Sequence, residues 1–151
     1  MKFVNGDILD AKHGIIGHQV NCSLVMGSGL AKQICDKYPA VFTDYVEVMG
    51  KATLKERLGK CQLIQVGSNM YIANLFGQLN YGRKNKQYTD YNALAMALVS
   101  LNKWRKKYFQ EIDRMPVYLP SGLGSDLGGG KWEVVKGIIS SAIPDAIIVK
   151  N

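Results

Sequence analysis

The sequence has no apolar run long enough to cross a membrane. A membrane-spanning helix needs roughly 20 consecutive apolar residues, and polar or charged residues interrupt every apolar stretch of this chain well before that length. The first residues, MKFVNGDILDAKH, also lack the apolar core of a secretory signal. We therefore expect no membrane partner and a cytoplasmic location.

Cysteine and histidine are scarce. The three cysteines, Cys22, Cys35 and Cys61, are odd in number and lack metal-ligand spacing, which argues against a disulfide framework and against a zinc site. The two histidines, His13 and His18, have no matching set of ligands. We therefore expect no metal and no cofactor, and a reducing compartment such as the cytosol.

Acidic residues are outnumbered, with 12 Asp and Glu against 19 Lys and Arg and a net charge of +7. Such a surface attracts polyanions, either nucleic acid or a small phosphorylated ligand. Two basic clusters stand out, GRKNKQY at 82–88 and KWRKKY at 103–108. A solvated helix end is the favoured interpretation, because cations suit the C-terminus of a preceding helix. Nucleic-acid binding remains the alternative, although no known motif accompanies the clusters.

The order of apolar patterns predicts the fold class. Strands are predicted at 2–4, 14–20, 61–66, 70–76, 115–119 and 145–150, and helices at 28–38, 40–49, 89–107 and 131–142. Strands that are apolar on both faces and alternate with helices predict an α/β fold in one domain, 1–151, with a three-layer α/β/α sandwich and a mixed, mostly parallel sheet. The same patterns predict Thr89 or Asp90 as a helix N-cap, and Phe42, Tyr45, Val46 and Met49 as the buried face of helix 40–49.

Glycine is concentrated in two loops that follow predicted strands and precede predicted helices. The first is NCSLVMGSGLAKQ at 21–33, and the second lies within YLPSGLGSDLGGGKWEVV at 118–135. Ligands of open α/β sheets bind outside the carboxyl ends of the strands. Glycine allows positive φ and close approach of backbone N–H groups to an anion, and a following helix adds its own free N–H groups. The two loops therefore predict a site for phosphate or pyrophosphate.

Neither loop matches a common phosphate-binding motif. In the P-loop pattern Ser125 stands where the first glycine belongs, and Trp132 replaces the Ser or Thr that binds magnesium. In the dinucleotide pattern, Lys32 and Leu127 occupy the position of the third glycine in the first and second loops. The sequence therefore predicts neither an ordinary NTPase nor an ordinary dehydrogenase.

Four stretches of the sequence carry a wider resemblance. They are NGDIL at 5–9, HQVNCSLVMGSGLAKQI at 18–34, NLFGQLNYG at 74–82 and LPSGLGSDLGGGKWEVV at 119–135. In this order and at these spacings they resemble the macro domain family, whose members bind ADP-ribose. The resemblance covers nearly the whole chain and implies ADP-ribose, or a derivative of it, as the ligand.

The resemblance also implies a role for each motif. Asp7 would accept a hydrogen bond from the adenine amino group, beside the Ile8 backbone. Asn21 would bond the hydroxyls of the distal ribose. The residues that would contact the ribose and wrap the diphosphate are Met26, Gly27, Ser28, Gly29 and Leu30 in the first loop, and Ser121, Gly122, Leu123, Gly124, Ser125, Asp126 and Leu127 in the second.

The activity implied by the resemblance has alternatives. Macro domains include readers of ADP-ribosylated macromolecules, hydrolases that remove ADP-ribose from protein or nucleic acid, and phosphatases of ADP-ribose 1''-phosphate. One hydrolase branch, resembling the terminal ADP-ribose glycohydrolases, uses a lysine and an acid about where Gln78 and Gly128 stand here. The motifs GHQVN and NLFGQLNYG look more like the phosphatase branch.

We therefore predict a hydrolase that converts ADP-ribose 1''-phosphate to ADP-ribose and phosphate. Asp126 is the expected general acid or base, with Asn21 holding the ribose and His18 as a further candidate. The offset of three between His18 and Asn21 predicts side chains on opposite faces of their strand. A de-ADP-ribosylase or a non-catalytic reader remains an alternative, and the partner would then be an ADP-ribosylated macromolecule.

Overall fold

Six strands form one mixed sheet in the computed structural model, which describes residues 1–82, 84–109 and 115–151. The strands are β1 (Lys2–Asn5), β2 (Gly14–Asn21), β3 (Cys61–Gly67), β4 (Met70–Gln78), β5 (Val117–Pro120) and β6 (Ile147–Lys150). Their order across the sheet is β1-β6-β5-β2-β4-β3. Only β3 runs antiparallel to its neighbour, and the other pairs are parallel. The prediction of a mixed, mostly parallel sheet is confirmed.

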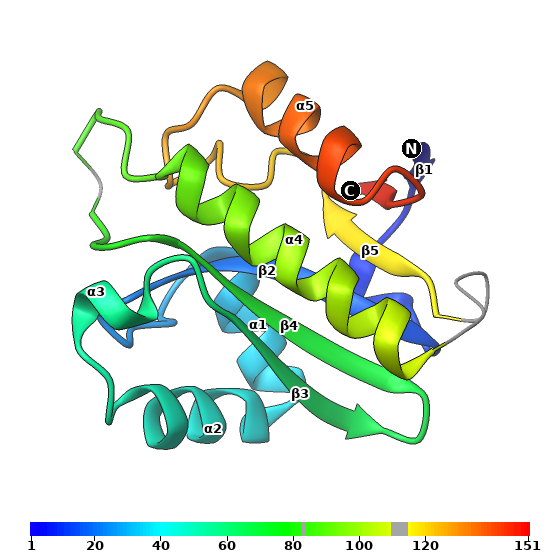
Figure 1. Cartoon of the computed structure of the whole chain (residues 1–151), viewed down its shortest axis with the longest axis horizontal. Helices are drawn as coiled ribbons and strands as arrows, with labels where there is room; N and C mark the ends of the chain where they lie inside the picture. Colours follow the sequence, from blue (N-terminus) through cyan, green and yellow to red (C-terminus); the bar gives the residue numbers. More distant parts are fainter. Residues whose placement is uncertain (83, 110–114) are drawn as a thin grey trace.

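Helices cover both faces of the sheet (Figure 1). They are α1 (Gly29–Lys37), α2 (Pro39–Met49), the short α3 (Leu54–Arg57), α4 (Tyr91–Tyr108) and α5 (Trp132–Ala142), and a 3-10 turn, η1, spans Ile8–Asp10. One buried cluster joins α4 and α5 to the sheet, and a second joins α1 and α2 to it. Successive residues of β2 divide between them, since Ile15 belongs to the first cluster and Ile16 to the second. This confirms the three-layer α/β/α sandwich.

Helix boundaries follow local chemistry. Asp90 caps α4, because its Oδ1 accepts a hydrogen bond from Ala93 N at 3.0 Å. The alternative cap, Thr89, instead donates its hydroxyl to the Gly124 carbonyl at 2.7 Å. None of the helices in the described ranges combines the length and hydropathy that a membrane crossing requires.

The buried face of α2 differs from the prediction. Val41 and Tyr45 are fully buried, whereas Phe42 is 40% and Val46 39% exposed, so the prediction was wrong for these two residues. Tyr45 sets the rotation of the helix, because its hydroxyl donates to the Asn21 carbonyl at 2.5 Å and its ring stacks on Phe76. The helix thus presents the stripe at 41 and 45 to the sheet.

The fold brings the ends of three parallel strands to one edge of the sheet. β2 ends at Asn21, β4 at Gln78 and β5 at Pro120. A break in the pairing register falls between Val20 and Asn21, where β2 leaves the sheet. The first glycine loop follows β2 and the second follows β5, so both start from this edge.

Candidate functional site

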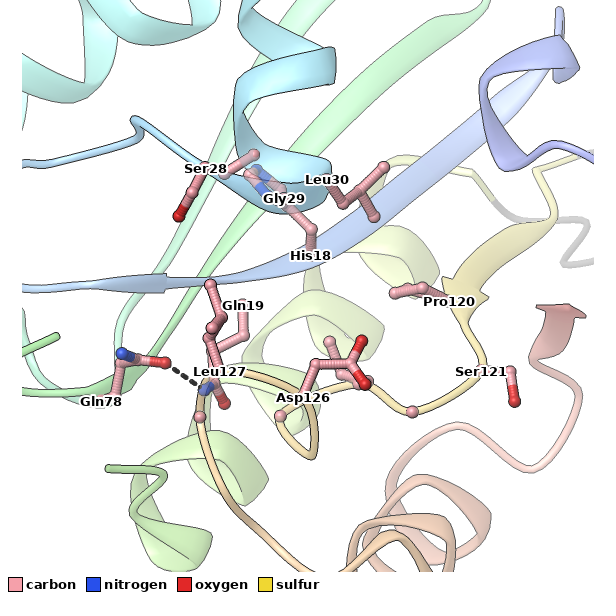
Figure 2. A pocket seen from close by; sticks show the side chains of 15 residues that line it. His18, Gln19, Ser28, Gly29, Leu30, Gln78, Pro120, Ser121, Asp126 and Leu127 are labelled. Carbon is pink, nitrogen blue, oxygen red and sulfur yellow. Dashed lines mark hydrogen bonds between the residues drawn. The ribbon is translucent and has the colours of Figure 1, made fainter. Parts of the chain in front are cut away.

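Two adjoining cavities lie where the glycine loops meet. The first has a volume of about 170 Å³ and lies between the start of α1 and the second loop (Figure 2). The second has a volume of about 550 Å³ and extends along the first loop towards Tyr81 and Gly82. They share five lining residues, which are Gln19, Ser28, Ala31, Gln78 and Leu127. One extended ligand can therefore pass from one cavity to the other.

Most of the residues predicted from the sequence line these cavities. The first cavity brings together His18, Ser28, Gly29, Leu30, Ser121, Gly122, Leu123, Gly124, Asp126 and Leu127. The second adds Asn21, Met26 and Gly27. Three predicted residues, Asp7, Ile8 and Ser125, line neither cavity. The lining residues that sequence reasoning did not assign to the ligand are Gln19, Val20, Val25, Ala31, Gln78, Tyr81, Gly82, Pro120 and Gly128.

Asp7 and Ile8 lie at the N-terminal end of η1. The Oδ1 atom of Asp7 accepts a hydrogen bond from Leu9 N at 2.9 Å and so caps this turn, and its side chain is exposed. Ile8 is buried in the cluster beneath α1 and α2. Contact of these two residues with adenine stays a prediction, because the cavities end before they reach η1.

Residues on two sides of the first cavity carry backbone N–H groups that are free to bind a ligand. The first backbone bond of α1 runs from Lys32 N to Ser28 O, so the N–H groups of the three residues before Lys32 have no carbonyl partner among the described residues. Across the cavity, five N–H groups of the second loop donate to no protein group within the described ranges, those of Gly122, Gly124, Asp126, Leu127 and Gly128. Oxygen atoms of a diphosphate suit two such facing sets of donors.

The second loop is held in place by side chains from β2 and the segment before α4. Gln19 Nε2 donates to Gln78 Oε1 at 2.6 Å and to Thr89 Oγ1 at 2.8 Å. The Thr89 hydroxyl in turn donates to the Gly124 carbonyl. The backbone N–H groups of Tyr88 and Thr89 both donate to the Gly128 carbonyl. The loop therefore has fixed anchors at two of its glycines.

Position 128 has room only for glycine. A Cβ atom there would clash with Thr89 Oγ1 and approach the Gly124 carbonyl to 2.7 Å. The acid of the glycohydrolase-like branch therefore has no space at this position without a shift of Thr89. Gln78, at the position of that branch's lysine, has its amide engaged at both ends, since its Nε2 donates to Asn80 O at 2.8 Å.

Asp126 is the one carboxylate among the described residues that line the two cavities. It is exposed, and Figure 2 shows its carboxylate on the second loop, across the cavity from the start of α1. Ser125, its neighbour, turns back on the loop, with its N–H bonded to Gly122 O at 2.8 Å. Asp126 can therefore reach a ligand or water in the cavity, whereas Ser125 stabilises the turn.

Asn21 and His18 lie on the same side of β2, contrary to the prediction. Asn21 Oδ1 accepts from the Tyr45 hydroxyl of α2 at 3.2 Å, and the His18 ring bonds Asn74, which leads to α2 through Gln62. The register break at Val20 and Asn21 ends the alternation on which the prediction depended. Strand periodicity alone could not show this break.

The Asn21 amide is largely committed to the first loop. Its Nδ2 donates to Val25 O at 2.8 Å, and its Oδ1 accepts from Ser23 N at 3.0 Å. With the Tyr45 hydroxyl also on Oδ1, one Nδ2 hydrogen remains for a ligand. Asn21 can therefore donate to a ribose hydroxyl but has little capacity left to accept from one.

His18 is neutral at physiological pH. The side chain is 2% exposed, and burial lowers its pKa to about 4, although the bond to Asn74 acts in the opposite direction. Its Nε2 lies 2.6 Å from Asn74 Oδ1, and its Nδ1 has no hydrogen-bond partner among the residues that the structure describes. The ring lines the first cavity as an uncharged group.

Acidification is expected to destabilise the protein through His18. Its folded-state pKa of about 4 lies below the ordinary 6.5. The contribution of neutral His18 to the stability of the fold is therefore fully present above pH 6.5 and is lost as the pH falls towards 4. The loss is roughly 3 kcal/mol, because each pKa unit corresponds to about 1.4 kcal/mol. Urea unfolding at pH 7 and pH 4.5 should show that the free energy of unfolding falls less between these pH values in His18→Gln than in the wild type. Equal losses in the two proteins would contradict the assignment, and His13→Gln is the matched control.

The two basic clusters take different roles. The cluster at 103–108 forms the last turns of α4, as predicted for a helix end, but its Arg105 is fully buried and bonds Asp145 Oδ1 at 2.7 Å. In the cluster at 82–88, Lys84 and Lys86 are exposed, and Arg83 lies outside the described residues. The solvated-surface interpretation is therefore wrong for Arg105, which is a structural cation.

Comparisons with known proteins agree on one group of relatives, although no family model matches the chain. This chain is 31% identical over 141 residues to the ADP-ribose 1''-phosphate phosphatase of Saccharomyces cerevisiae (strain YJM789), and the match covers 87% of this chain and 78% of that protein. The macrodomain of Mycobacterium tuberculosis DarG superposes with a TM-score of 0.78 at 25% identity, covering 99% of this chain and 95% of that one. Thermosipho africanus DarTG in complex with ADP-ribose superposes with a TM-score of 0.72 at 17% identity, covering 99% of this chain and 41% of that one.

Proposed function

The chain belongs to the macro domain family, and from this premise we propose that it binds ADP-ribose and hydrolyses ADP-ribose 1''-phosphate. The observation that carries the proposal is that residues on two sides of the first cavity carry backbone N–H groups with no protein partner in the described ranges. A diphosphate carries negative charge along a short chain of oxygen atoms, and donors from a helix start and a glycine loop match it. The activity of the yeast relative supports the choice of substrate.

We propose that the ligand occupies both cavities. The diphosphate occupies the first cavity, and the distal ribose enters the second, where Asn21 donates its remaining amide hydrogen to a ribose hydroxyl. The 1''-phosphate then lies near the junction of the cavities, which Gln19, Ser28 and Leu127 share. The adenine extends towards Asp7 and Ile8 as the family resemblance implies.

Hydrolysis in this arrangement needs a positioned water. Asp126 orients the water and takes its proton as the water oxygen bonds to phosphorus. The bond between phosphorus and the ribose oxygen breaks, and that oxygen takes up the proton held by Asp126, through solvent, which gives ADP-ribose and inorganic phosphate and restores the Asp126 carboxylate. Backbone N–H groups of the second loop stabilise the charge that builds on the phosphate oxygens. The loop anchors at Gly124 and Gly128 keep these donors in place.

Removal of ADP-ribose from protein or nucleic acid is the second candidate. It is favoured by the volume of the second cavity, about 550 Å³, beside the exposed Tyr81. It is disfavoured by the lack of space for an acid at Gly128 and by the engaged amide of Gln78. Assays on ADP-ribosylated protein and DNA, run beside phosphate release from ADP-ribose 1''-phosphate, separate the two functions. Binding without any turnover would identify a reader.

ADP-ribose is expected to bind in a 1:1 ratio and more tightly than AMP or NAD. AMP lacks the distal ribose that meets Asn21, and NAD carries nicotinamide on the anomeric carbon, which would crowd the first loop at Met26 and Gly27. Isothermal titration calorimetry of the three ligands is the measurement. NAD binding as tight as ADP-ribose binding would contradict the placement of the distal ribose.

A further inference from the structure

A chain of hydrogen bonds runs behind His18, away from the cavity. The Asp44 carbonyl of α2 accepts from Gln62 Nε2 at 3.0 Å, Gln62 Oε1 accepts from Asn74 Nδ2 at 3.1 Å, and Asn74 Oδ1 lies 2.6 Å from His18 Nε2. The chain crosses from α2 through β3 and β4 to β2. Asn74 is fully buried, and no other side chain bonds its amide within the described ranges.

The carbonyl at one end of this series of hydrogen bonds fixes which group donates and which accepts in each of them. A backbone carbonyl can only accept, so Gln62 must present its NH₂ group to Asp44 and its oxygen to Asn74. Asn74 must then present its NH₂ group to Gln62 and its oxygen to His18. Reversing either amide would place two oxygens or two NH₂ groups face to face in a buried site, which is costly. Asn74 Oδ1 therefore receives a hydrogen from His18 Nε2.

The tautomer of His18 follows from this assignment of donors and acceptors. A neutral imidazole carries one hydrogen, so a hydrogen on Nε2 leaves a lone pair on Nδ1. Nδ1 is buried and has no hydrogen-bond partner within the described part of the chain, and His18 lines the first cavity beside Ser28 and Gly29. A lone pair in this place accepts a hydrogen bond from an O–H group, and it repels the oxygen of an ionised phosphate.

We propose that Asn74 and Gln62 are positioning residues that hold His18 in its Nε2-protonated tautomer, so that Nδ1 accepts a hydrogen bond from an O–H group in the first cavity. This inference rests on the proposed function and adds a role for His18 within it. The O–H group belongs either to a ribose hydroxyl of the ligand or to the attacking water. The partly buried Gln62 of β3 and the buried Asn74 of β4 thus set which chemical group His18 recognises.

The tautomer can be measured on the protein without ligand. Long-range ¹H–¹⁵N spectra distinguish the two neutral tautomers and the imidazolium, and His13→Gln assigns the signals because the chain has two histidines. At pH 7 we expect His18 to be neutral with its hydrogen on Nε2. The Nδ1-protonated tautomer, or the imidazolium, would overturn the inference whether or not the protein turns over substrate.

Gln62→Met is the decisive variant, because Gln62 is only partly buried whereas Asn74 lies in the core. It releases Asn74, whose amide can then turn its NH₂ group to His18 and move the hydrogen to Nδ1. We expect a changed tautomer and a loss of roughly 10–100-fold in kcat/KM, by analogy with the loss when the partner that orients a metal-bound histidine is removed. Gln65→Met, the same substitution at an exposed position of β3, is the matched control and should change neither.

The kinetic split identifies the source of the O–H group. If it is the attacking water, Gln62→Met lowers kcat and leaves ADP-ribose affinity unchanged. If it is a ribose hydroxyl, the variant weakens ADP-ribose binding by a similar factor. An unchanged tautomer in Gln62→Met, or a changed tautomer with wild-type turnover and affinity, overturns the inference. Absence of turnover in the wild type, with the expected tautomer present, would instead count against the proposed phosphatase activity alone.

Discussion

Gly124→Val is expected to weaken ADP-ribose binding by at least about 100-fold. Gly124 has φ +71°, and a Cβ atom there would lie 3.0 Å from Gln19 Oε1 and 3.3 Å from Thr89 Oγ1. A β-branched residue in this conformation costs roughly 1–3 kcal/mol, so the loop should relax out of its anchored shape. Each 1.4 kcal/mol of lost binding energy is about tenfold in affinity, and a displaced loop loses several donors together.

Gly67→Val is the matched control for this variant. Gly67 ends β3, has no positive φ, and an added Cβ would contact only Met70 at 3.4 Å. Calorimetry should show unchanged ADP-ribose affinity for Gly67→Val, and thermal unfolding should show that both variants are folded. Wild-type affinity in a folded Gly124→Val protein would mean that the second loop is not the diphosphate site.

Asp126→Ala is expected to lower phosphate release from ADP-ribose 1''-phosphate by about 10²–10⁴-fold, the usual loss for a general base. Asp126 is the carboxylate of the first cavity, and it is exposed, so its removal should leave the fold intact. ADP-ribose affinity should be retained, because in the proposed site the diphosphate binds backbone N–H groups that do not depend on this side chain. Steady-state kinetics of phosphate release, beside calorimetry, measure the two effects separately.

Asp36→Ala serves as the control for Asp126. Asp36 pairs with Lys32 on the outer surface of α1, where both side chains are more than half exposed, and such pairs contribute little to stability. It should release phosphate at the wild-type rate. Equal rates in Asp126→Ala and the wild type would remove Asp126 from the mechanism. Brisk removal of ADP-ribose from protein or DNA, without phosphate release, would assign the protein to the second candidate function.

The sequence predicted the layers of the fold because each rests on a local pattern. Strands that are apolar on both faces require helices above and below them, and the alternation of elements then leads to a mostly parallel sheet. The face of α2 was the exception. Its periodicity allowed either Phe42 or Val41 to point inward, and the choice depends on the contact of Tyr45 with Asn21, a residue of another element.

The candidate site was predictable where it depends on backbone and not where it depends on distant side chains. The glycines indicated the two loops, because few other residues can adopt the conformations and the close packing that these loops require. The anchor between Gln19 and Thr89 joins residues 70 positions apart, and the bond between His18 and Asn74 spans 56 positions. No local pattern signals such pairs. The register break at Asn21 likewise depends on the neighbouring strand.

The pairing of β1 with β6 has a consequence for how the protein folds. β1 lies at the edge of the sheet and its partner is β6, with Lys2 opposite Ile147. Among the described strands, β1 pairs with β6 alone, so this pairing cannot form until residues 147–150 have been synthesised. Contacts of such long sequence separation form late and slow the folding rate. η1, which directly follows β1, should acquire its final position only in that last step, after the central strands and the glycine loops have assembled.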